Sequence, residues 1–429
     1  MELRSTLAER SAAVFPGGSL GEYNLPEGMA VVLARGEGAT VWDAAGRRFL
    51  DFTMGWGSVL LGHAHPAVVE AVRRQAGLGS NFAYVSAPAL ELAEELRRAV
   101  ACAERLRFCA SGTEATAYAV RLARAFTGRP RLLKFEGAYH GANEIGTVSL
   151  FPSRLLDFPR GEPTSAGLPS SAVSDVLVAP FNELETTRAI VAAHRDGLAG
   201  IIVEPVHRCT PPRPGFLDGL RRLASDTGSL LIYDETVTGF RLAYGGAQEY
   251  YGVRPDLCAL GKALGGGYPL GAVAGRADVL DLVREDRMGE ERYVWFASSL
   301  GGNPVSAAAG LAALGELRQP GTYERLFALG EALRSGLRRV LREEGVTAQV
   351  QGDGPLAAVF FTDGEVVDYR SAFRADRQRA RAFLLGLFRR GIFLNPMSTK
   401  LYLSLAHTVV DIERFLDIAR TTLREDCRG

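Results

Sequence analysis

The sequence predicts an α/β fold in which a large, mainly parallel β-sheet is covered by helices and joined to a smaller α+β domain. Short apolar runs alternate with longer helical patterns through the middle of the chain. This alternation is typical of parallel sheets, because each strand is connected to the next by a crossover helix. Both ends of the chain depart from the pattern, which predicts that together they form the smaller domain.

The strands predicted for the large sheet are short and mostly apolar: residues 105–111, 131–137, 175–181, 199–205, 229–235 and 270–276. Helices are predicted between most of them, including residues 91–101 and 113–126, where apolar and small side chains recur every three or four positions. Residues 151–174 are rich in proline, serine and glycine and are predicted to form an irregular loop.

The flanking segments predict a different kind of structure. Residues 29–52 read as a small hairpin with two glycine-containing turns, and strands are predicted at 356–364 and 400–406 after long amphipathic helices. We therefore expect residues 1–60 and 315–429 to form the small domain and residues 61–314 to form the large one.

The composition excludes several classes of function. Lys+Arg and Asp+Glu both number 49, so a formal net charge of zero gives no electrostatic case for binding nucleic acid or an acidic membrane surface. No apolar stretch reaches the length of a transmembrane helix, and residues 1–15 lack the apolar core of an export signal. The five cysteines are widely spaced without a CxxC pair, which argues against disulfides or zinc and favours a reducing cytoplasm.

Three short motifs match familiar sites, but the residues around them do not support those sites. Residues 17–21 match GxSxG but follow a proline rather than a strand, so they do not predict a nucleophile elbow. The Gly261-Lys262 pair lacks the remaining residues of a phosphate-binding P-loop. His63 and His65 have no acidic or cysteine partner nearby in the sequence, so we predict structural histidines and no metal site.

Polar side chains follow three of the predicted strands. Asp234 and Glu235 end the run 229–235, Glu204 ends the run 199–205, and Lys262 follows the apolar residues 257–260. The carboxyl ends of parallel strands form the edge at which such sheets bind ligands. An acid alone there is as well explained by helix capping. Acids together with a lysine predict a cofactor that needs both a cation partner and an amine.

Two further segments complete this constellation. Ser111, Gly112 and Thr113, in ASGTEA, lie between a strand and a helix, where backbone N–H groups and hydroxyls can hold a phosphate. The alternative is an ordinary helix cap by Ser111 or Thr113. In GAYHG, residues 137–141, Tyr139 is flanked by glycines and suits stacking on a flat cofactor.

The motifs ASGTEA, GAYHG, VEP, YDETVTGFR, LGKALGGGYPLGA and GGNPVSAAAG occur here in the order seen in class-III pyridoxal-phosphate aminotransferases. Together with LLGHAHP and LSLAHT they cover nearly the whole chain, and the sequence is most similar to the glutamate-1-semialdehyde aminomutase branch. The resemblance implies a fold-type I enzyme that binds pyridoxal 5′-phosphate and forms a homodimer with active sites at the subunit interface.

Carried over by resemblance, Lys262 corresponds to the lysine that forms a Schiff base with the cofactor, and Asp234 to the acid that pairs with its pyridine nitrogen. Ser111, Gly112 and Thr113 correspond to the phosphate cradle, Tyr139 to the stacking residue and Ser299 to the residue that reaches the neighbouring subunit's phosphate. Glu204 and Thr236 complete the predicted cofactor contacts. Substrate contacts are predicted for Trp56, Arg208 and Lys400.

Three departures from the family pattern bear on the substrate. Thr236 replaces the valine that the family carries two residues after the aspartate. The segment after VEPV is shortened to HRCTPP, which leaves His207 as a candidate partner for the cofactor's phenolic oxygen. Lys400 stands where the mutases carry an acid, which favours a substrate carboxylate, such as that of a β-amino or aromatic amino acid; a solvated lysine at a strand edge is the alternative.

The leading hypothesis is an aminotransferase that moves an amino group between a carboxylate-bearing donor and a keto acid. The second is an intramolecular aminomutase of the glutamate-1-semialdehyde type. The third is a binding or regulatory protein that holds the cofactor without turnover, against which the intact Lys262 and Asp234 argue. In the first two, the Lys262 amine is expected to move the proton.

Overall fold

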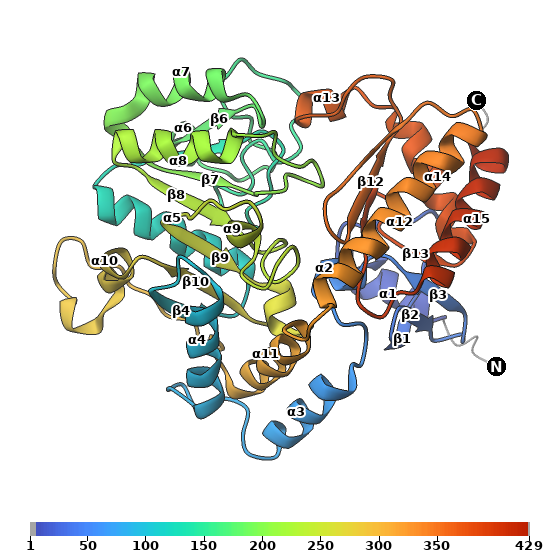
Figure 1. The fold of residues 1–429 in the computed structure, drawn as a ribbon, viewed down its shortest axis with the longest axis horizontal. Coiled ribbons are helices and arrows are strands. Elements are labelled where there is room, and N and C mark those ends of the chain that lie inside the picture. Colours follow the sequence, from blue (N-terminus) through green and yellow to red (C-terminus); the bar gives the residue numbers. More distant parts are fainter. Residues whose placement is uncertain (1–5, 428–429) are drawn as a thin grey trace. The chain divides into compact units, whose positions relative to one another are not determined.

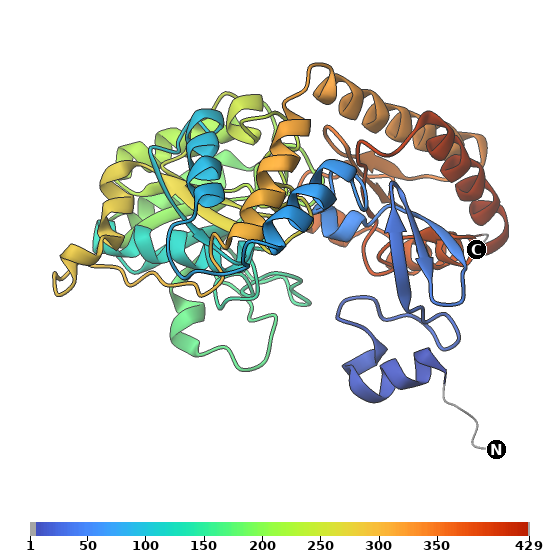
Figure 2. The same cartoon turned by 90° about the horizontal axis from the view of Figure 1, so that it is seen from below.

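A computed structural model describes residues 6–427, which fold into two compact units (Figures 1 and 2). The large unit comprises residues 66–323 and 367–373, and the small unit comprises the described residues up to 65 together with 324–366 and those from 374 onwards. The sequence did not predict that residues 367–373 belong to the large unit. The domain boundaries expected at residues 60 and 314 stay a prediction.

Within the described residues, the large unit holds a seven-stranded sheet in the order β4-β10-β9-β8-β7-β5-β6. Strands β6, β5, β7, β8 and β9 pair in parallel, whereas β10 is antiparallel to both of its neighbours, so β4 points the same way as the parallel strands. The expected mainly parallel sheet is confirmed. Its strands are β4 Arg105–Cys109, β5 Arg131–Phe135, β6 Val176–Ala179, β7 Leu198–Val203, β8 Leu230–Asp234, β9 Leu257–Leu260 and β10 Gly271–Gly275.

Helices surround these strands, and every residue of β6 to β10 is buried (Figure 1). Burial on both faces explains why the strands are continuous apolar runs rather than alternating patterns. Helix α5 (Gly112–Thr127) starts at the N-cap Ser111 and ends at Gly128, which adopts the left-handed conformation that favours glycine. The other helices of this unit are α3 Pro66–Ala76, α4 Ala87–Ala99, α6 Ser170–Ser174, α7 Leu184–His194, α8 Phe216–Thr227, α9 Ala247–Tyr250, α10 Ala277–Leu280, α11 Pro304–Leu317 and α13 Tyr369–Phe373.

The small unit contains two further sheets, in the orders β1-β2-β3-β13 and β11-β12-β14. The predicted hairpin at 29–52 is the antiparallel arrangement of β1 to β3. Apolar side chains of the long helices and both sheets form one core. The elements are α1 Leu7–Val14, β1 Leu33–Glu37, β2 Thr40–Asp43, β3 Arg48–Asp51, α2 Met54–Gly57, α12 Thr322–Glu343, β11 Gln349–Gln351, β12 Leu356–Phe360, α14 Arg377–Arg389, β13 Ile392–Phe393, β14 Lys400–Tyr402 and α15 Val409–Asp426.

Two local predictions need correction. The loop expected at 151–174 is irregular only as far as Pro169, because α6 forms its last five residues. His63, for which no acidic partner was expected, places Nε2 2.7 Å from Oδ2 of Asp51. Asp51 is the last residue of β3, and a strand-end carboxylate was not considered for this histidine.

Other sequence observations concern the N-terminal region and membranes. The GxSxG match at 17–21 overlaps a short 3₁₀ turn, Pro16–Gly18, rather than a strand-to-helix turn. Of residues 1–15, examined above for an export signal, the first five lie outside the described residues. Among residues 6–427, no helix combines the length and the apolar character needed to cross a membrane.

Candidate active site

The candidate site of the large unit is built at one edge of its sheet. β8 ends at Asp234, β7 ends just before Glu204, and β9 is followed by Gly261 and Lys262. These strands are parallel, so their carboxyl ends meet at the same edge. β4 points the same way, which brings Ser111 and Gly112 to that edge. The predicted strand-end residues therefore share one side of the sheet.

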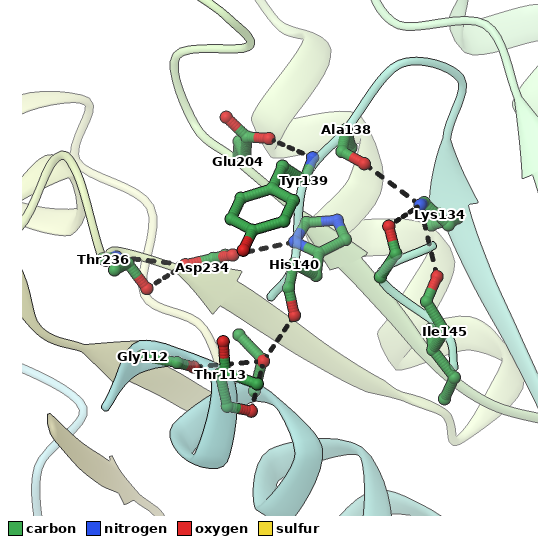
Figure 3. A network of polar contacts seen from close by, with 12 residues as sticks. Gly112, Thr113, Lys134, Ala138, Tyr139, His140, Ile145, Glu204, Asp234 and Thr236 are labelled. Carbon is green, nitrogen blue, oxygen red and sulfur yellow. Dashed lines mark hydrogen bonds and ion pairs between the residues drawn. The ribbon is translucent and has the colours of Figure 1, made fainter. Parts of the chain in front are cut away.

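Asp234 is a buried carboxylate with three hydrogen bonds (Figure 3). Its Oδ1 accepts the Thr236 N–H at 3.0 Å and the Thr236 hydroxyl at 2.5 Å. Its Oδ2 lies 2.8 Å from Nδ1 of His140. Because an ionised carboxylate only accepts hydrogen bonds, Nδ1 of His140 carries the proton. These donors allow a negative charge to persist in a buried place.

Glycines bring three segments close together around this carboxylate. A Cβ added at Gly112 would lie 2.6 Å from Cγ2 of Thr236, so no larger residue fits there without displacing the threonine. A Cβ at Gly261 would lie 3.2 Å from the same methyl carbon. The start of α5, the end of β8 and the end of β9 therefore approach more closely than side chains would allow.

Lys262 follows β9 directly and begins a short 3₁₀ helix, Lys262–Gly265. Its φ of 47° lies in the left-handed region, which a residue with a Cβ adopts at an energetic cost. The side chain is half-buried. A lysine in this backbone conformation, directly after the closely packed Gly261, marks the position as constrained by its surroundings.

The start of α5 shows the helix cap that was the alternative for this segment, whereas its role in holding a phosphate stays a prediction. Oγ of Ser111 accepts the N–H of Glu114 at 3.2 Å, which is an ordinary N-cap. The Thr113 hydroxyl accepts the N–H of Ala142 at 3.3 Å. The α5 N-terminus faces the same sheet edge as Asp234, and its dipole favours an anion at that end.

Tyr139 lies on the loop that follows β5 and is 36% exposed. Its backbone N–H donates to Oε1 of Glu204 at 2.6 Å (Figure 3). The guanidinium of Arg208 lies 5.8 Å from the Tyr139 ring centroid, and its Nε donates to the Gly137 carbonyl at 3.0 Å. Nη2 of Arg208 is buried and has no hydrogen-bond partner among the described residues.

His207 is buried and stacks on Phe181, with 4.9 Å between the ring centroids. Burial lowers the pKa of His207 to about 4, so the ring is neutral near pH 7. Neither ring nitrogen has a hydrogen-bond partner within the described part of the chain.

Three further predicted residues are Ser299, Trp56 and Lys400. Ser299 belongs to the large unit, and its carbonyl accepts a hydrogen bond from the Asn81 amide at 3.0 Å. Trp56 and Lys400 belong to the small unit. The Trp56 ring contacts Tyr23 edge-on at 5.7 Å, and Lys400 begins β14 with Nζ 5.1 Å from the Tyr402 ring centroid.

The sequence analysis missed two residues of this network, His140 and Lys134. His140 was quoted in GAYHG without a role, although its place beside Tyr139 ties it to the same loop. Lys134 lies within β5 and is fully buried. Its signal in the sequence is a lysine among apolar residues, RLLKF, which is the kind of placement that drew attention to Lys262.

Comparisons with known proteins agree with this architecture. The family model for class-III aminotransferases matches residues 23–413. The chain is 41% identical to a glutamate-1-semialdehyde 2,1-aminomutase of Thermomicrobium roseum, with all of both chains covered.

Two solved structures are also similar. An omega-transaminase from Sphaerobacter thermophilus has 38% identity and a TM-score of 0.92, covering 99% of this chain and 97% of the other. A β-phenylalanine aminotransferase from Variovorax paradoxus has 33% identity and a TM-score of 0.86, covering 97% and 92%. The chain therefore belongs to the class-III aminotransferases and is a pyridoxal-phosphate-dependent enzyme.

Proposed function

We propose that the protein is an aminotransferase that moves an amino group between a carboxylate-bearing amino donor and a keto acid. The residues of the large unit fit pyridoxal phosphate in three ways. Asp234 offers a buried carboxylate to a pyridinium nitrogen, and Lys262 offers an amine at the same edge of the sheet. Gly112, where a Cβ would lie 2.6 Å from Cγ2 of Thr236, keeps the start of α5 close to Thr236, at a helix N-terminus suited to a phosphate.

In this proposal each residue has a defined task. Lys262 would hold the cofactor through its amine and would move a proton at the substrate carbon. Asp234 keeps the pyridine nitrogen protonated, and the bound cofactor supplies a ring that withdraws electrons from that carbon. Ser111, Gly112 and Thr113 hold the phosphate, and Tyr139 stacks on the ring while Thr236 packs beside it. Glu204 acts by fixing the Tyr139 backbone.

The assignment of Lys262 can be tested directly. Borohydride reduction of the holoenzyme fixes the cofactor to the amine that holds it, and peptide mapping then identifies the residue. The sequence contains three lysines, Lys134, Lys262 and Lys400, so the map has few alternatives. A label on either of the other two lysines would remove Lys262 from its proposed role.

The environment of Arg208 is the observation that carries the choice of substrate. Its guanidinium lies between the rings of Tyr139 and Phe151, 5.8 and 4.8 Å from their centroids, and its buried Nη2 has no hydrogen-bond partner in the part of the chain that the structure describes. A buried N–H group without an acceptor is unfavourable, and a carboxylate supplies the acceptor that a guanidinium binds most strongly. This supports a substrate carboxylate, such as that of a β-amino or aromatic amino acid.

The test compares two donors that differ only in the carboxylate: β-phenylalanine, and 1-phenylethylamine as the matching amine. We expect Arg208→Gln to lower kcat/KM for β-phenylalanine, with a loss of transition-state stabilisation of about 2–5 kcal/mol. The kcat/KM for the amine should change little. Lys400→Met, assayed in parallel, tests the second predicted carboxylate contact. Equal losses on both donors for Arg208→Gln would remove the proposed anchor.

The alternative is an intramolecular aminomutase, favoured by the names of the curated relatives at about the 40% identity level. The two reactions differ in whether an external keto acid is consumed. Turnover of an amino donor that stops without a keto acid and resumes with it supports the transaminase. Complete conversion of glutamate-1-semialdehyde without any acceptor supports the mutase.

We further propose a homodimer in which Ser299 completes the partner's phosphate site. Ser299 is linked to Asn81, and the neighbouring segments expose large apolar side chains: Leu78, Phe82, Tyr84, Val85, Trp295 and Leu300. Exposed apolar side chains gathered in this way are typical of protein interfaces. If the site is shared, inactive Lys262→Ala and Ser299→Trp chains are expected to restore activity when mixed.

A further inference from the structure

Lys134 is fully buried in β5, with its ammonium group among backbone carbonyls (Figure 3). Nζ lies 3.1 Å from the carbonyl oxygen of Ala138, 3.3 Å from those of Ile145 and Gly146, and 2.5 Å from that of Val148. These carbonyls belong to the loop after β5, which carries Tyr139 and His140. The Lys134 amine is therefore bound inside the loop that builds the candidate site.

The loop needs such a donor because its backbone is buried but irregular. Ala138, His140, Val148 and Ser149 are almost completely shielded from water. Of the four carbonyls, only that of Ile145 has a backbone donor within the described chain, the N–H of Val148 at 3.4 Å. A buried carbonyl without a donor is unfavourable, and one ammonium group offers three N–H donors to this set.

The composition of the chain supports a specific requirement for lysine here. Lys and Arg together number 49, and only three of these residues are lysine. Two of the three have proposed roles at or near the cofactor. Lys134 is the third, in a fully buried pocket of carbonyls. A compact ammonium can be surrounded by carbonyls on several sides, whereas the planar guanidinium of arginine directs its donors in a fixed fork.

The contact with Ala138 connects this cation to the site. The peptide group between Ala138 and Tyr139 is held at both ends: its carbonyl accepts from Lys134, and its N–H donates to Glu204 at 2.6 Å. Opposite charges thus fix the orientation of one peptide plane. That orientation determines the direction of the Tyr139 side chain and the position of the next residue, His140, whose Nδ1 bonds Asp234.

We propose that Lys134 is a positioning residue for the reaction: together with Glu204 it clamps the Ala138–Tyr139 peptide, so that Tyr139 and His140 meet the cofactor and Asp234 in fixed orientations. The inference rests on the proposed role of Tyr139 in stacking on the cofactor. Lys134 itself touches neither the cofactor nor Asp234 in this arrangement.

The charges around Lys134 agree with this role. Burial lowers the pKa of Lys134 to about 7; the Glu204 carboxylate opposes this shift and Arg208 adds to it. The carbonyl oxygens favour the charged form, since each accepts a hydrogen bond from the ammonium. Glu204 therefore supports the clamp in two ways, by holding the Tyr139 N–H and by stabilising the charge on Lys134.

The test replaces Lys134 by methionine, which keeps the length of the side chain and removes its charge. In the holoenzyme of Lys134→Met we expect cofactor affinity and kcat each to fall by about tenfold or more, the size of one lost charge-assisted hydrogen bond. The induced circular dichroism of the bound cofactor should weaken, because the ring is no longer fixed by Tyr139. KM for the amino donor should change by less than about twofold.

Arg334→Met is a matched control in the small unit. Arg334 is also a buried cation, whose Nη1 donates to the carbonyls of Gly354 and Leu356 at 2.6 and 2.8 Å. Both variants should lower the unfolding midpoint, but only Lys134→Met should alter the circular dichroism of the cofactor. The same change in both, or in neither, would overturn the positioning role.

A second variant keeps the inference testable if Lys134→Met does not fold. Glu204→Gln approaches the same peptide from its N–H side, retains an acceptor oxygen and removes the charge. We expect the same weakening of the circular dichroism, to a smaller extent. An unchanged signal in Glu204→Gln would contradict the clamp. Borohydride mapping of this variant separates the two proposals, because a label that remains on Lys262 leaves the proposed function intact even when the clamp fails.

Discussion

The two units of the protein contain the same local arrangement, an aspartate at the end of a strand paired with a histidine. In the large unit Asp234 ends β8 and lies 2.8 Å from His140; in the small unit Asp51 ends β3 and lies 2.7 Å from His63. Both carboxylates are buried. In both, the second oxygen accepts a backbone N–H from residues just after the strand.

The surroundings of the two pairs differ. Oδ1 of Asp51 accepts the N–H groups of Thr53 and Met54, at the start of a turn, Met54–Gly57, in which all four residues have a positive φ. Asp234 instead lies where Gly112 and Gly261 pack closely against Thr236, next to a loop whose tyrosine is partly exposed. The first pair holds a turn of residues with positive φ, whereas the second lies at the sheet edge where we propose that the cofactor binds. An Asp–His pair by itself does not distinguish structure from catalysis.

The largest effect that separates the two pairs is expected from Asp234→Asn. The amide keeps the shape of the side chain but removes the charge that we propose holds the pyridinium proton. We expect kcat to fall by about 10²–10³, on the scale of other electrostatic losses in active sites. Single-turnover kinetics and cofactor absorbance give the measurement. Near-normal turnover with bound cofactor would show that the carboxylate of Asp234 has no such role.

The pH dependence of stability shows whether the buried histidines of the two units behave alike. Burial lowers the pKa of His207, in the large unit, and of His407, in the small unit, to about 4 each. Between pH 6.5 and 4 the unfolded chain binds protons that the folded chain does not, so stability is present above pH 6.5 and lost as pH falls through this window. The expected loss is about 3 kcal/mol for each histidine.

Urea unfolding at pH 7.5 and at pH 4.5 measures this loss for each unit. His207→Phe and His407→Phe should each remove that histidine's part of the loss in unfolding free energy between the two pH values. The double variant should remove both parts. A cofactor-free wild-type protein whose stability is unchanged between these two pH values would contradict the assignment of both histidines as neutral.

Asp51→Asn, the counterpart of Asp234→Asn, should act on stability instead of chemistry. Its loss weakens the bond to His63 and the hold on the turn at Met54, for which we expect about 1–3 kcal/mol in the free energy of unfolding. The absorbance of the bound cofactor should not change. If Asp51→Asn altered that absorbance as strongly as Asp234→Asn, the functional distinction between the two pairs would be wrong.

The sequence predicts the fold and the chain positions of the site, but not the contacts around them. Apolar runs and strand ends are local properties, so the sheet and the positions of Asp234 and Lys262 can be read from the residues. The expected mainly parallel sheet is confirmed, whereas the roles of these residues stay a prediction.

Contacts between distant segments could not be read in this way. The bond between His140 and Asp234 joins residues 94 positions apart, and the bond between Tyr139 and Glu204 joins residues 65 apart. Lys134 and the loop it binds are close in sequence. The residues RLLKF, however, do not indicate that this loop turns its backbone carbonyls toward the Lys134 amine. The same limit explains why His63 was given no acidic partner, although Asp51 lies only 12 residues earlier.

The smallest expected effect comes from Thr236, the residue that departs from the family's valine. Asp51 accepts two backbone N–H groups at its Oδ1, whereas Asp234 accepts one N–H and the Thr236 hydroxyl at 2.5 Å. This hydroxyl stabilises the charge of Asp234, so the carboxylate interacts less strongly with a pyridinium.

Thr236→Val retains a methyl group beside Gly112 and removes only the donor. We expect the cofactor-free protein to lose about 1 kcal/mol of stability, and cofactor binding to strengthen by a similar amount, because the freed carboxylate oxygen binds the pyridinium more tightly. The unfolding midpoints of Thr236→Val with and without cofactor should therefore differ by more than those of the wild type. Thr236→Ser keeps the hydroxyl, so its two midpoints should differ by the same amount as in the wild type. A smaller separation in Thr236→Val would mean that the hydroxyl supports the cofactor rather than competing with it.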